Sequence, residues 1–239
     1  MEAIILAGGR GERLGDEARG RPKALVDIAG SPLITYQVEL LRRAGVQRII
    51  VSCARGQAGA FKSALPELEP EIVYAEEPER LGRGGGLRFA AEFRQEKGPV
   101  FALNGDELLA LDLRAVQDRQ RDSGAAAAIV VAPLRSSFGI VDMDEEGCVL
   151  SFVEAPVLPY WVNAGAYVLS DEALDLLPLK GDHEESTFPQ LARERRLVAY
   201  RHTGVWLTVN TPKDLRKARS YIRQYPNWLA SMSDSVSRA

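Results

Sequence analysis

Residues 3–14 read Ala-Ile-Ile-Leu-Ala-Gly-Gly-Arg-Gly-Glu-Arg-Leu, and Pro22-Lys23 follows shortly after them. The apolar run at residues 3–6 predicts a buried strand, and the glycines behind it let the backbone turn sharply and approach a ligand closely. Arg13 and Lys23 bring two cationic groups to the same loop. A glycine turn at the end of a strand, with cations attached, is suited to holding a polyphosphate.

This loop differs from the two best-known phosphate-binding motifs. A Walker A loop has Ser or Thr after its lysine, whereas Ala24 follows Lys23 here. The dinucleotide fingerprint needs a third glycine where this chain has Leu14. The plainer alternative is an ordinary strand-to-helix turn with two solvated cations, and the length of the whole string favours the phosphate interpretation over it.

Composition places the chain among ordinary globular proteins. It has 239 residues, 46% of them hydrophobic and 26% charged, which is enough for one large domain or two small ones. The net charge is −3, and the scattered lysines and arginines form no basic stripe for nucleic acid. No apolar run approaches a membrane span, and Met1-Glu2 leads directly into the first strand, without a signal peptide. We therefore expect a cytoplasmic protein with neither a membrane nor a nucleic-acid partner.

The two cysteines, Cys53 and Cys148, lie in apolar segments typical of strands. A disulfide between them is an alternative, but the sequence favours two buried free thiols in a reducing compartment. Together with His183 and His202 they are too few and too dispersed for a zinc site.

Short apolar runs alternate with helical patterns through the first half of the chain. After the first strand, the pattern predicts a helix at 33–43 and strands at 48–53, 71–74 and 100–103. This alternation predicts an α/β fold, with a largely parallel sheet and helices on both faces. The second half predicts strands at 125–131, 162–169, 197–200 and 205–209, a hairpin of 139–142 with 149–153, and a helix at 212–225. With no repeat or linker, we expect one domain over residues 1–226 and a frayed tail at 227–239.

Three polar loop starts are expected at one edge of this sheet, because the carboxyl ends of parallel strands meet at the same edge. Gly8 follows the first strand, Glu77 the third and Asp106 the fourth. A carboxylate at Asp106 is well placed to hold Mg²⁺ against phosphate oxygens. The alternative is a helix-capping aspartate in an ordinary Asn-Gly turn.

A second glycine cluster, residues 81–87, precedes a helical stretch expected at 87–93. Adjacent glycines at a helix start suggest that the backbone closely approaches a planar or anionic group. A flexible loop tip is the alternative.

Six motifs, in order along the chain, resemble those of the sugar-1-phosphate nucleotidyltransferases, also called nucleotide-sugar pyrophosphorylases. The resemblance covers residues 1–222 and is closest in style to mannose- and heptose-1-phosphate guanylyltransferases. The family patterns are L-A-G-G-x-G-x-R-L with P-K, L-G-T-G-G-A, N-G-D, Y-G-V-V with F-x-E-K-P, N-A-G, and W-x-D-I-G-T-P-x-D-L. Their counterparts here are residues 6–14 with 22–23, 81–86, 104–106, 138–141 with 152–156, 163–165 and 206–215.

The resemblance implies a Rossmann-like three-layer α/β/α fold around a central mixed, mostly parallel sheet. It also implies that an NTP and a sugar 1-phosphate form an NDP-sugar and pyrophosphate, by Mg²⁺-assisted in-line attack on the α-phosphate. The implied catalytic residues are Arg13, Lys23 and Asp106, and Asp106 is also the implied metal ligand. The implied nucleotide-binding residues are Leu6, Ala7, Gly8, Gly9, Gly11, Glu77, Gly82 and Asn104, and the implied sugar-binding residues are Gly139, Glu154 and Asn163.

The chain departs from the family pattern at two positions. Ala155 replaces the lysine that meets the sugar phosphate, and Thr208 replaces the second metal aspartate. Asn210, or less directly Glu107, is the expected compensating metal ligand, since an amide oxygen can ligate Mg²⁺. The candidates for the missing cation are Arg135 and Arg83.

Glu77 favours guanine, because a carboxylate accepts the adjacent N1–H and N2–H₂ donors together, whereas uracil and thymine offer one imide N–H. We therefore expect GTP, with uridylyl or thymidylyl transfer as alternatives, and a mannose-, heptose- or cyclitol-like 1-phosphate as acceptor. A regulatory paralogue that binds a nucleotide sugar with little catalysis stays open. A cofactor nucleotidyltransferase of the molybdopterin kind is disfavoured by residues 152–156 and 163–165. A homodimer is compatible with the sequence.

Overall fold

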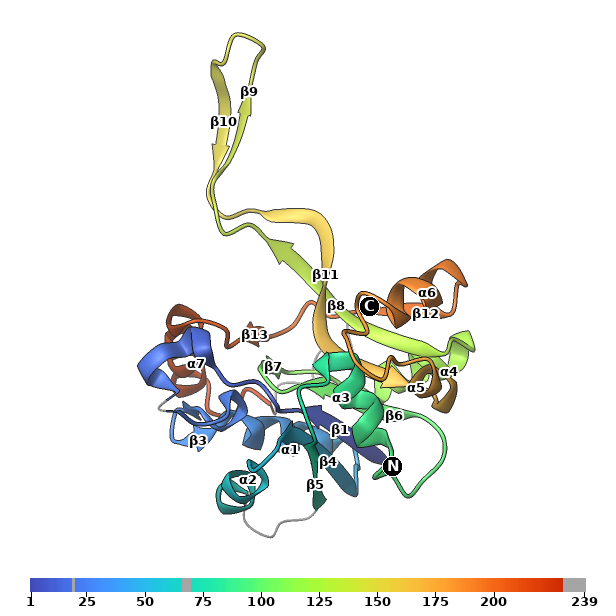
Figure 1. The fold of residues 1–239 in the computed structure, drawn as a ribbon. Coiled ribbons are helices and arrows are strands. Elements are labelled where there is room, and N and C mark those ends of the chain that lie inside the picture. Colours follow the sequence, from blue (N-terminus) through green and yellow to red (C-terminus); the bar gives the residue numbers. More distant parts are fainter. Residues whose placement is uncertain (19, 66–69, 230–239) are drawn as a thin grey trace.

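The computed structural model describes residues 1–18, 20–65 and 70–229. Its centre is a seven-stranded sheet with helices on both faces (Figure 1). The strands of this sheet are β1 (Glu2–Leu6), β4 (Arg48–Ala54), β5 (Glu71–Glu77), β6 (Val100–Asn104), β8 (Ala127–Arg135), β11 (Val157–Leu169) and β12 (Leu197–Arg201). Separate two-stranded ladders pair β2 (Asp27–Ile28) with β3 (Ser31–Pro32), β7 (Glu107–Leu109) with β13 (Trp206–Thr208), and β9 (Ile140–Met143) with β10 (Val149–Val153).

The strand order in the central sheet is β12-β8-β11-β6-β1-β4-β5. Strand β1 pairs in parallel with β4 and with β6, and β4 pairs in parallel with β5. Strand β8 pairs in parallel with β12. Strand β11 runs antiparallel to its two neighbours, β6 and β8. The expected α/β fold with a mixed, mostly parallel sheet is therefore confirmed. The loops that follow β1, β5 and β6 start at one edge of the sheet, because these strands run in the same direction.

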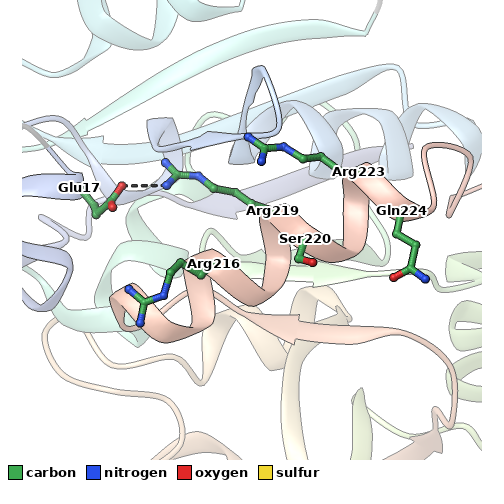
Figure 2. A pocket seen from close by; sticks show the side chains of 6 residues that line it. All are labelled: Glu17, Arg216, Arg219, Ser220, Arg223 and Gln224. Atoms are coloured by element: carbon green, nitrogen blue, oxygen red, sulfur yellow. Dashed lines mark hydrogen bonds and ion pairs between the residues drawn. The ribbon is translucent and has the colours of Figure 1, made fainter.

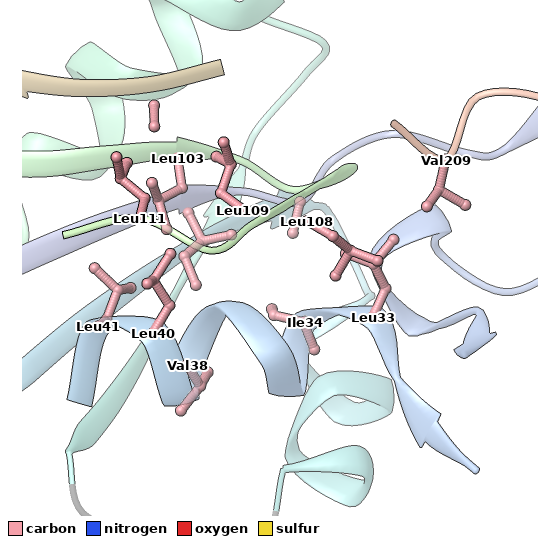
Figure 3. Close-up of a cluster of buried hydrophobic side chains, with 14 of the residues drawn as sticks. Leu33, Ile34, Val38, Leu40, Leu41, Leu103, Leu108, Leu109, Leu111 and Val209 are labelled. Carbon is pink, nitrogen blue, oxygen red and sulfur yellow. The ribbon is translucent and has the colours of Figure 1, made fainter. Parts of the chain in front are cut away.

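Alternating side chains along the strands build a core on each face of the sheet. In β1, Ala3 and Ile5 join one buried cluster, and Ile4 joins the other. Figure 3 shows part of the first cluster, in which Leu40 and Leu41 of α1 point toward the strands. The helices of the described residues are η1 (Glu12–Glu17), η2 (Lys23–Leu25), α1 (Leu33–Arg43), α2 (Ala58–Ala64), α3 (Gly82–Ala91), α4 (Leu113–Ser123), α5 (Asp171–Asp175), α6 (Thr187–Arg193) and α7 (Pro212–Gln224).

Helix α3 begins at Gly82, before the helical stretch expected from residue 87. The carbonyl of Gly181 accepts hydrogen bonds from the amides of Gly84 and Gly85, at 2.9 and 3.1 Å. A Cβ at Gly84 would lie 2.8 Å from atoms of the segment 178–183, and one at Gly85 would lie 2.7 Å from it. The close backbone approach predicted for these two glycines is therefore to the chain itself, and the expectation of a planar or anionic partner there is wrong.

The same segment contains a histidine whose burial gives the fold a pH dependence. The His183 side chain is fully buried, and its ring nitrogens have no hydrogen-bond partner among the described residues. Burial lowers the pKa of His183 to about 4, because the charged imidazolium is poorly solvated there. The unfolded chain takes up this proton near pH 6.5, so stability that is fully present above pH 6.5 is lost as the pH falls toward 4.

We expect His183→Leu to weaken that acid sensitivity. Between pH 7.5 and pH 5, the free energy of unfolding of the wild type should fall by about 2 kcal/mol more than that of the variant. Urea unfolding at the two pH values measures this difference. A variant with the same pH dependence as the wild type would show that His183 is not the responsible group.

The hairpin of β9 and β10 belongs to an arm, residues 136–156, that projects away from the body (Figure 1). Every residue of both strands is exposed. The expected hairpin is confirmed, but Cys148 is an exposed free cysteine at this arm, so its predicted burial is wrong. Its apolar flanks suggested a core strand, whereas the arm leaves those flanks uncovered. Cys53 is buried and free, as expected.

The packed part of the chain extends past the expected boundary at residue 226. Trp228 and Leu229 are 3% and 7% exposed and join the core, where the Trp228 ring lies 6.1 Å from that of Tyr36. The first residues of the expected tail are thus packed, and residues 230–239 lie outside the described residues. Among the described residues, none of the helices combines the length and hydropathy of a bilayer-spanning segment.

Candidate functional site

Three segments far apart in the sequence meet at the side chain of Lys23. Its Nζ donates to Oδ2 of Asp106 and to Oδ1 of Asn210, each at 2.6 Å. The Lys23 and Asp106 side chains are 12% and 29% exposed, so the ion pair is largely screened from water yet open on one side. The structure thus brings together the expected α-phosphate lysine and the two expected metal ligands.

Backbone hydrogen bonds hold these segments in place. The Lys23 amide donates to the carbonyl of Gly9 at 2.9 Å, which ties η2 to the glycine loop. The Gly105 amide donates to the carbonyl of Leu6 at 2.8 Å, which joins the loops after β1 and β6. The carbonyl of Asp106 accepts from the amide next to Asn210, at 2.9 Å. The site therefore rests on rigid strand ends.

The glycine loop lies against both Lys23 and Glu77. A Cβ at Gly9 would lie 3.9 Å from Cβ of Lys23, and one at Gly8 would lie 3.4 Å from Oε1 of Glu77. Gly11 has φ +68°, a conformation that favours glycine. The loop of Leu6, Ala7 and these three glycines therefore runs between the lysine and the carboxylate.

Glu77 ends β5 and is 8% exposed. Its Oε1 accepts from Oγ of Ser52 at 2.8 Å, and its Oε2 accepts from the amide of Leu81 at 3.1 Å. Each carboxylate oxygen has a second lone pair, so Glu77 can still accept donors from a base. A Cβ at Gly86 would lie 2.9 Å from Oε1, so this glycine of the cluster makes room for the carboxylate.

Asn104 and Asn163 converge on one hydroxyl. Their Nδ2 atoms donate to Oη of the buried Tyr167 at 3.3 and 2.8 Å. Oδ1 of Asn163 accepts from the amide of Gly165, at 3.0 Å. The expected nucleotide-side and sugar-side residues thus share a tyrosine that sequence reasoning missed. The strand is irregular between Asn163 and Tyr167, so simple alternation along it does not point to this contact.

Glu107 is a buried carboxyl beside the site. It is 8% exposed, and its Oε2 accepts from Nε1 of Trp206 at 2.8 Å. Burial, and next the neighbouring Asp106 carboxylate, raise the pKa of Glu107 to about 9. The Glu107 side chain is thus held by Trp206, whereas Asn210 lies with Asp106 at Nζ of Lys23, and this favours Asn210 among the two expected alternatives.

The expected catalytic arginine and the two candidates for the missing cation occupy different environments. Arg13 lies exposed on η1 and has no ion pair within the described ranges. Arg83 pairs at 3.0 Å with both Asp182 and Glu184, so its charge is already neutralised. Nη1 of Arg135 donates to the carbonyl of residue 155 at 3.0 Å, which places this cation beside the alanine that replaces the family lysine.

Three expected ligand-binding residues make no hydrogen bond or ion pair with Lys23 but have close neighbours of their own among the described residues. Gly139 and Glu154 belong to the arm, where a Cβ at Gly139 would lie 3.0 Å from Oε2 of Glu154. Gly82 packs against Gly181, whose carbonyl oxygen would lie 2.7 Å from a Cβ at Gly82. The structure therefore assembles the nucleotide side of the expected site around Lys23 but leaves the sugar-side pair on the arm.

A separate hollow lies on the outer side of α7 (Figure 2). Arg216, Arg219 and Arg223 project from successive turns of the helix, and Nη1 of Arg219 pairs with Glu17 at 2.9 Å. The hollow contains none of the residues around Lys23. Its remaining lining residues are Ser220 and Gln224.

Comparison with known proteins agrees with the geometry of the site. Mannose-1-phosphate guanylyltransferase catalytic subunit beta from Drosophila pseudoobscura pseudoobscura is 31% identical over 221 residues, which are 89% of this chain and 60% of the relative. Mannose-1-phosphate guanyltransferase 2 from Candida glabrata is 30% identical over 255 residues, with 100% of this chain and 71% of the relative covered. The chain therefore spans about 60–70% of the length of these curated relatives.

A solved structure and a family model extend the comparison. The crystal structure of HddC from Yersinia pseudotuberculosis complexed with GMP-PN has a TM-score of 0.71 and 26% identity, covering 92% of this chain and 99% of that one. The model of the family described as Nucleotidyl transferase matches residues 2–225. With nearly its whole length matched, the chain belongs to the nucleotidyl transferase family.

Proposed function

We propose that the chain transfers a nucleotidyl group from an NTP, preferably GTP, to a sugar 1-phosphate and releases pyrophosphate. The observation that carries the proposal is the contact of Lys23 with both Asp106 and Asn210 beside a glycine loop. The names of the relatives, which are mannose-1-phosphate guanylyltransferases, support it. The buried free thiol of Cys53 is consistent with a reducing, cytoplasmic setting.

Positioning and charge neutralisation supply the catalysis. The amides of Gly8, Gly9 and Gly11 face the triphosphate, and Lys23 holds the α-phosphate and the attacking sugar phosphate together. Arg13, exposed and without an ion pair in the described chain, stabilises the charge that develops on the pyrophosphate. An oxygen of the sugar phosphate attacks the α-phosphorus in line, and the pyrophosphate leaves on the opposite side.

Asp106 and Asn210 fit a site for Mg²⁺. Their oxygens already share one cation, each lying 2.6 Å from Nζ of Lys23. Magnesium prefers oxygen ligands, and one or two protein groups with phosphate oxygens and water complete its shell. Bound there, the ion would neutralise charge on the α-phosphate, and the Lys23 ammonium would be available to contact phosphate.

Glu77 reads the base. Its position beside Gly8 and its free lone pairs suit the paired N–H donors of guanine. HddC, complexed with GMP-PN, supports a guanine nucleotide. We expect Glu77→Gln to lower kcat/KM for GTP by about 10–100-fold, since it removes charge-assisted hydrogen bonds, and to change kcat/KM for UTP much less.

The matched control is Glu76→Gln. Glu76 is the neighbouring carboxylate, but its Oε1 accepts from the amide of Ala58 at 2.8 Å. The ratio of kcat/KM for GTP to that for UTP should stay at the wild-type value in this control. An unchanged ratio in Glu77→Gln would refute base recognition by Glu77.

The acceptor is a sugar 1-phosphate, with mannose 1-phosphate first among the mannose-, heptose- and cyclitol-like candidates because the relatives bear its name. Arg135, beside residue 155, supplies the cation that the missing lysine would have provided. Asn163 faces the sugar hydroxyls from its place beside Tyr167.

Pyrophosphate release tests the proposal. Each of GTP, UTP, dTTP, ATP and CTP is paired with mannose, glucose and heptose 1-phosphates in the presence of Mg²⁺. The highest kcat/KM is expected with GTP and mannose 1-phosphate. Absence of turnover with every pair would reject it.

The departures at Ala155 and Thr208 favour one second candidate, a regulatory paralogue that binds a nucleotide sugar. It predicts tight binding of GDP-mannose by calorimetry without pyrophosphate release. The contact of Lys23 with both Asp106 and Asn210 argues for turnover.

A further inference from the structure

We infer that Gln37 is a positioning residue, which holds the turn that presents Asp106 to the substrates. The inference rests on the proposed function, which assigns Asp106 to catalysis and to the metal. Gln37 lies in the middle of α1, and its amide bonds to the backbone on both sides of Asp106. It is not among the residues that the sequence predicted for the site.

Gln37 interrupts an apolar face of α1. Its neighbours on this face recur at helical spacing and are all apolar: Leu33, Ile34, Val38, Leu40 and Leu41. Gln37 itself is 3% exposed. Helix α1 packs against β7, the strand that begins directly after Asp106 (Figure 3). The amide therefore faces the loop that carries Asp106 instead of water.

The two hydrogens of the Gln37 amide span the turn between β6 and β7. Nε2 donates to the carbonyl of Asn104 at 2.7 Å and to the carbonyl of Glu107 at 2.9 Å. Asn104 is the last residue of β6, and Glu107 is the first of β7. Gly105 and Asp106 form the turn between them. One side chain thus joins both ends of the segment that carries the carboxylate.

The position of the Asp106 carboxylate follows that of the turn, because its side chain is short. The carbonyl of Asp106 accepts from the amide of Val209 at 2.9 Å, and the Gly105 amide donates to the carbonyl of Leu6 at 2.8 Å. These bonds join the turn to its neighbours, and the Gln37 bonds join it to α1. A shift of about 1 Å at a reacting group can cost about 100-fold in rate, so the hold of Gln37 on the turn bears directly on turnover.

Packing alone does not account for a glutamine at this position. Oε1 of Gln37 is buried and has no hydrogen-bond partner within the described ranges. An unpaired buried acceptor lowers stability, and methionine fills a similar space without a buried amide. What glutamine adds over methionine is the pair of bonds from Nε2 to the turn.

Gln120 provides a matched control. It is a second buried glutamine on a helix, 9% exposed in α4, and its Nε2 also donates to a backbone carbonyl, that of Ala125. This carbonyl lies between α4 and β8, in a segment without any of the residues assigned to the site. Gln37→Met and Gln120→Met therefore remove the same chemical group from two different places in the fold.

Amide hydrogen exchange on the protein without metal or nucleotide tests whether Gln37 holds the turn. In Gln37→Met, exchange in the peptide that covers residues 104–109 should become about 10–100-fold faster, because the ends of the turn are no longer joined. In Gln120→Met, the same peptide should exchange at the wild-type rate. Unchanged exchange in Gln37→Met would overturn the inference.

The dependence of pyrophosphate release on Mg²⁺ concentration tests whether the turn positions Asp106. With saturating GTP and mannose 1-phosphate, the Mg²⁺ concentration that gives half of the maximal rate should rise about 10–100-fold in Gln37→Met. It should keep the wild-type value in Gln120→Met, although the thermal midpoints of both variants should fall. Faster exchange at the turn, with kcat and Mg²⁺ dependence equal to those of the wild type, would overturn the positioning role and leave Gln37 a purely structural one.

Gln37→Asn keeps the test decisive if the methionine variant does not fold. Asparagine retains the amide but is shorter by a methylene group, so its amide stops short of the two carbonyls. Exchange and Mg²⁺ dependence should then change in the same direction as in Gln37→Met, with Gln120→Asn as control. A wild-type chain that releases no pyrophosphate with any substrate pair would reject the proposed function, while hydrogen exchange would still decide whether Gln37 holds the turn.

Discussion

Replacing Asp106 by asparagine is expected to lower the rate of pyrophosphate release by about 10²–10³-fold, with the fold unchanged. The substitution keeps the shape of the side chain but removes the charge that pairs with Lys23 at 2.6 Å. Under the proposed function, it also removes the anionic oxygen that would ligate Mg²⁺, which the amide of Asn210 alone would then have to hold. A coupled assay of pyrophosphate with saturating GTP and mannose 1-phosphate measures the loss in kcat.

The matched control is Asp118→Asn. Asp118 is an exposed residue of α4, and its ion pair among the described residues is with Arg121, at 2.7 Å within the same helix. Its replacement should leave kcat within a factor of two, since exposed ion pairs of this kind contribute little. Normal turnover by Asp106→Asn, with a circular dichroism spectrum equal to that of the wild type, would remove Asp106 from the metal site.

Gly105→Ala is expected to have the largest effect on stability of any glycine-to-alanine change near the site. A Cβ at this position would lie 2.3 Å from the carbonyl oxygen of Leu6, far inside contact distance. The added Cβ is fixed to the backbone, and the Leu6 oxygen is part of the backbone, so no side-chain rotation can relieve the contact. Strands β1 and β6 would therefore have to separate at their ends. We expect a loss of about 3 kcal/mol, or roughly 6–12 °C in Tm for a chain of this size.

The same change should reduce turnover, since Asp106 is the next residue and a shift of about 1 Å can cost about 100-fold in rate. Gly59→Ala is the control. Gly59 lies in α2 with nothing within 4 Å of its Cβ position, so alanine should be neutral or stabilise by up to about 1 kcal/mol. Equal midpoints for the two variants in thermal unfolding would contradict the close contact at Gly105.

Much of the fold could be predicted because its signals are local. The periodicity that predicts a helix at 33–43 matches α1, and Pro212 at the first turn marks the start of α7. The short strands β2, β3 and β7 escaped prediction, since two or three residues carry no period. Helix α3 was expected late because glycines at a helix start resemble a loop, and the segment 178–183 that stabilises it lies about 100 residues away.

The candidate site also has parts that the sequence predicts and parts that depend on distant contacts. Lys23 and Asp106 could be placed together because parallel strands end at one edge of the sheet. Asn210 could be added because its motif resembles that of the family. Tyr167 and the raised pKa of Glu107 depend on burial created by distant segments, which no local pattern of residues indicates. The position of the arm depends on strands β8 and β11, which continue past the sheet edge, and alternation alone does not indicate that.

The ammonium of Lys23 acts as an internal counter-ion in the resting protein. With its charge matched by Asp106, Lys23 itself presents little net attraction to small anions such as inorganic phosphate, which would have to break a 2.6 Å ion pair to reach it. Under the proposed function, a polyphosphate that arrived with its own cation would give Asp106 a new partner and would free Lys23 in the same event. Selectivity for the metal complex of the nucleotide over free phosphate would then follow from the pairing itself.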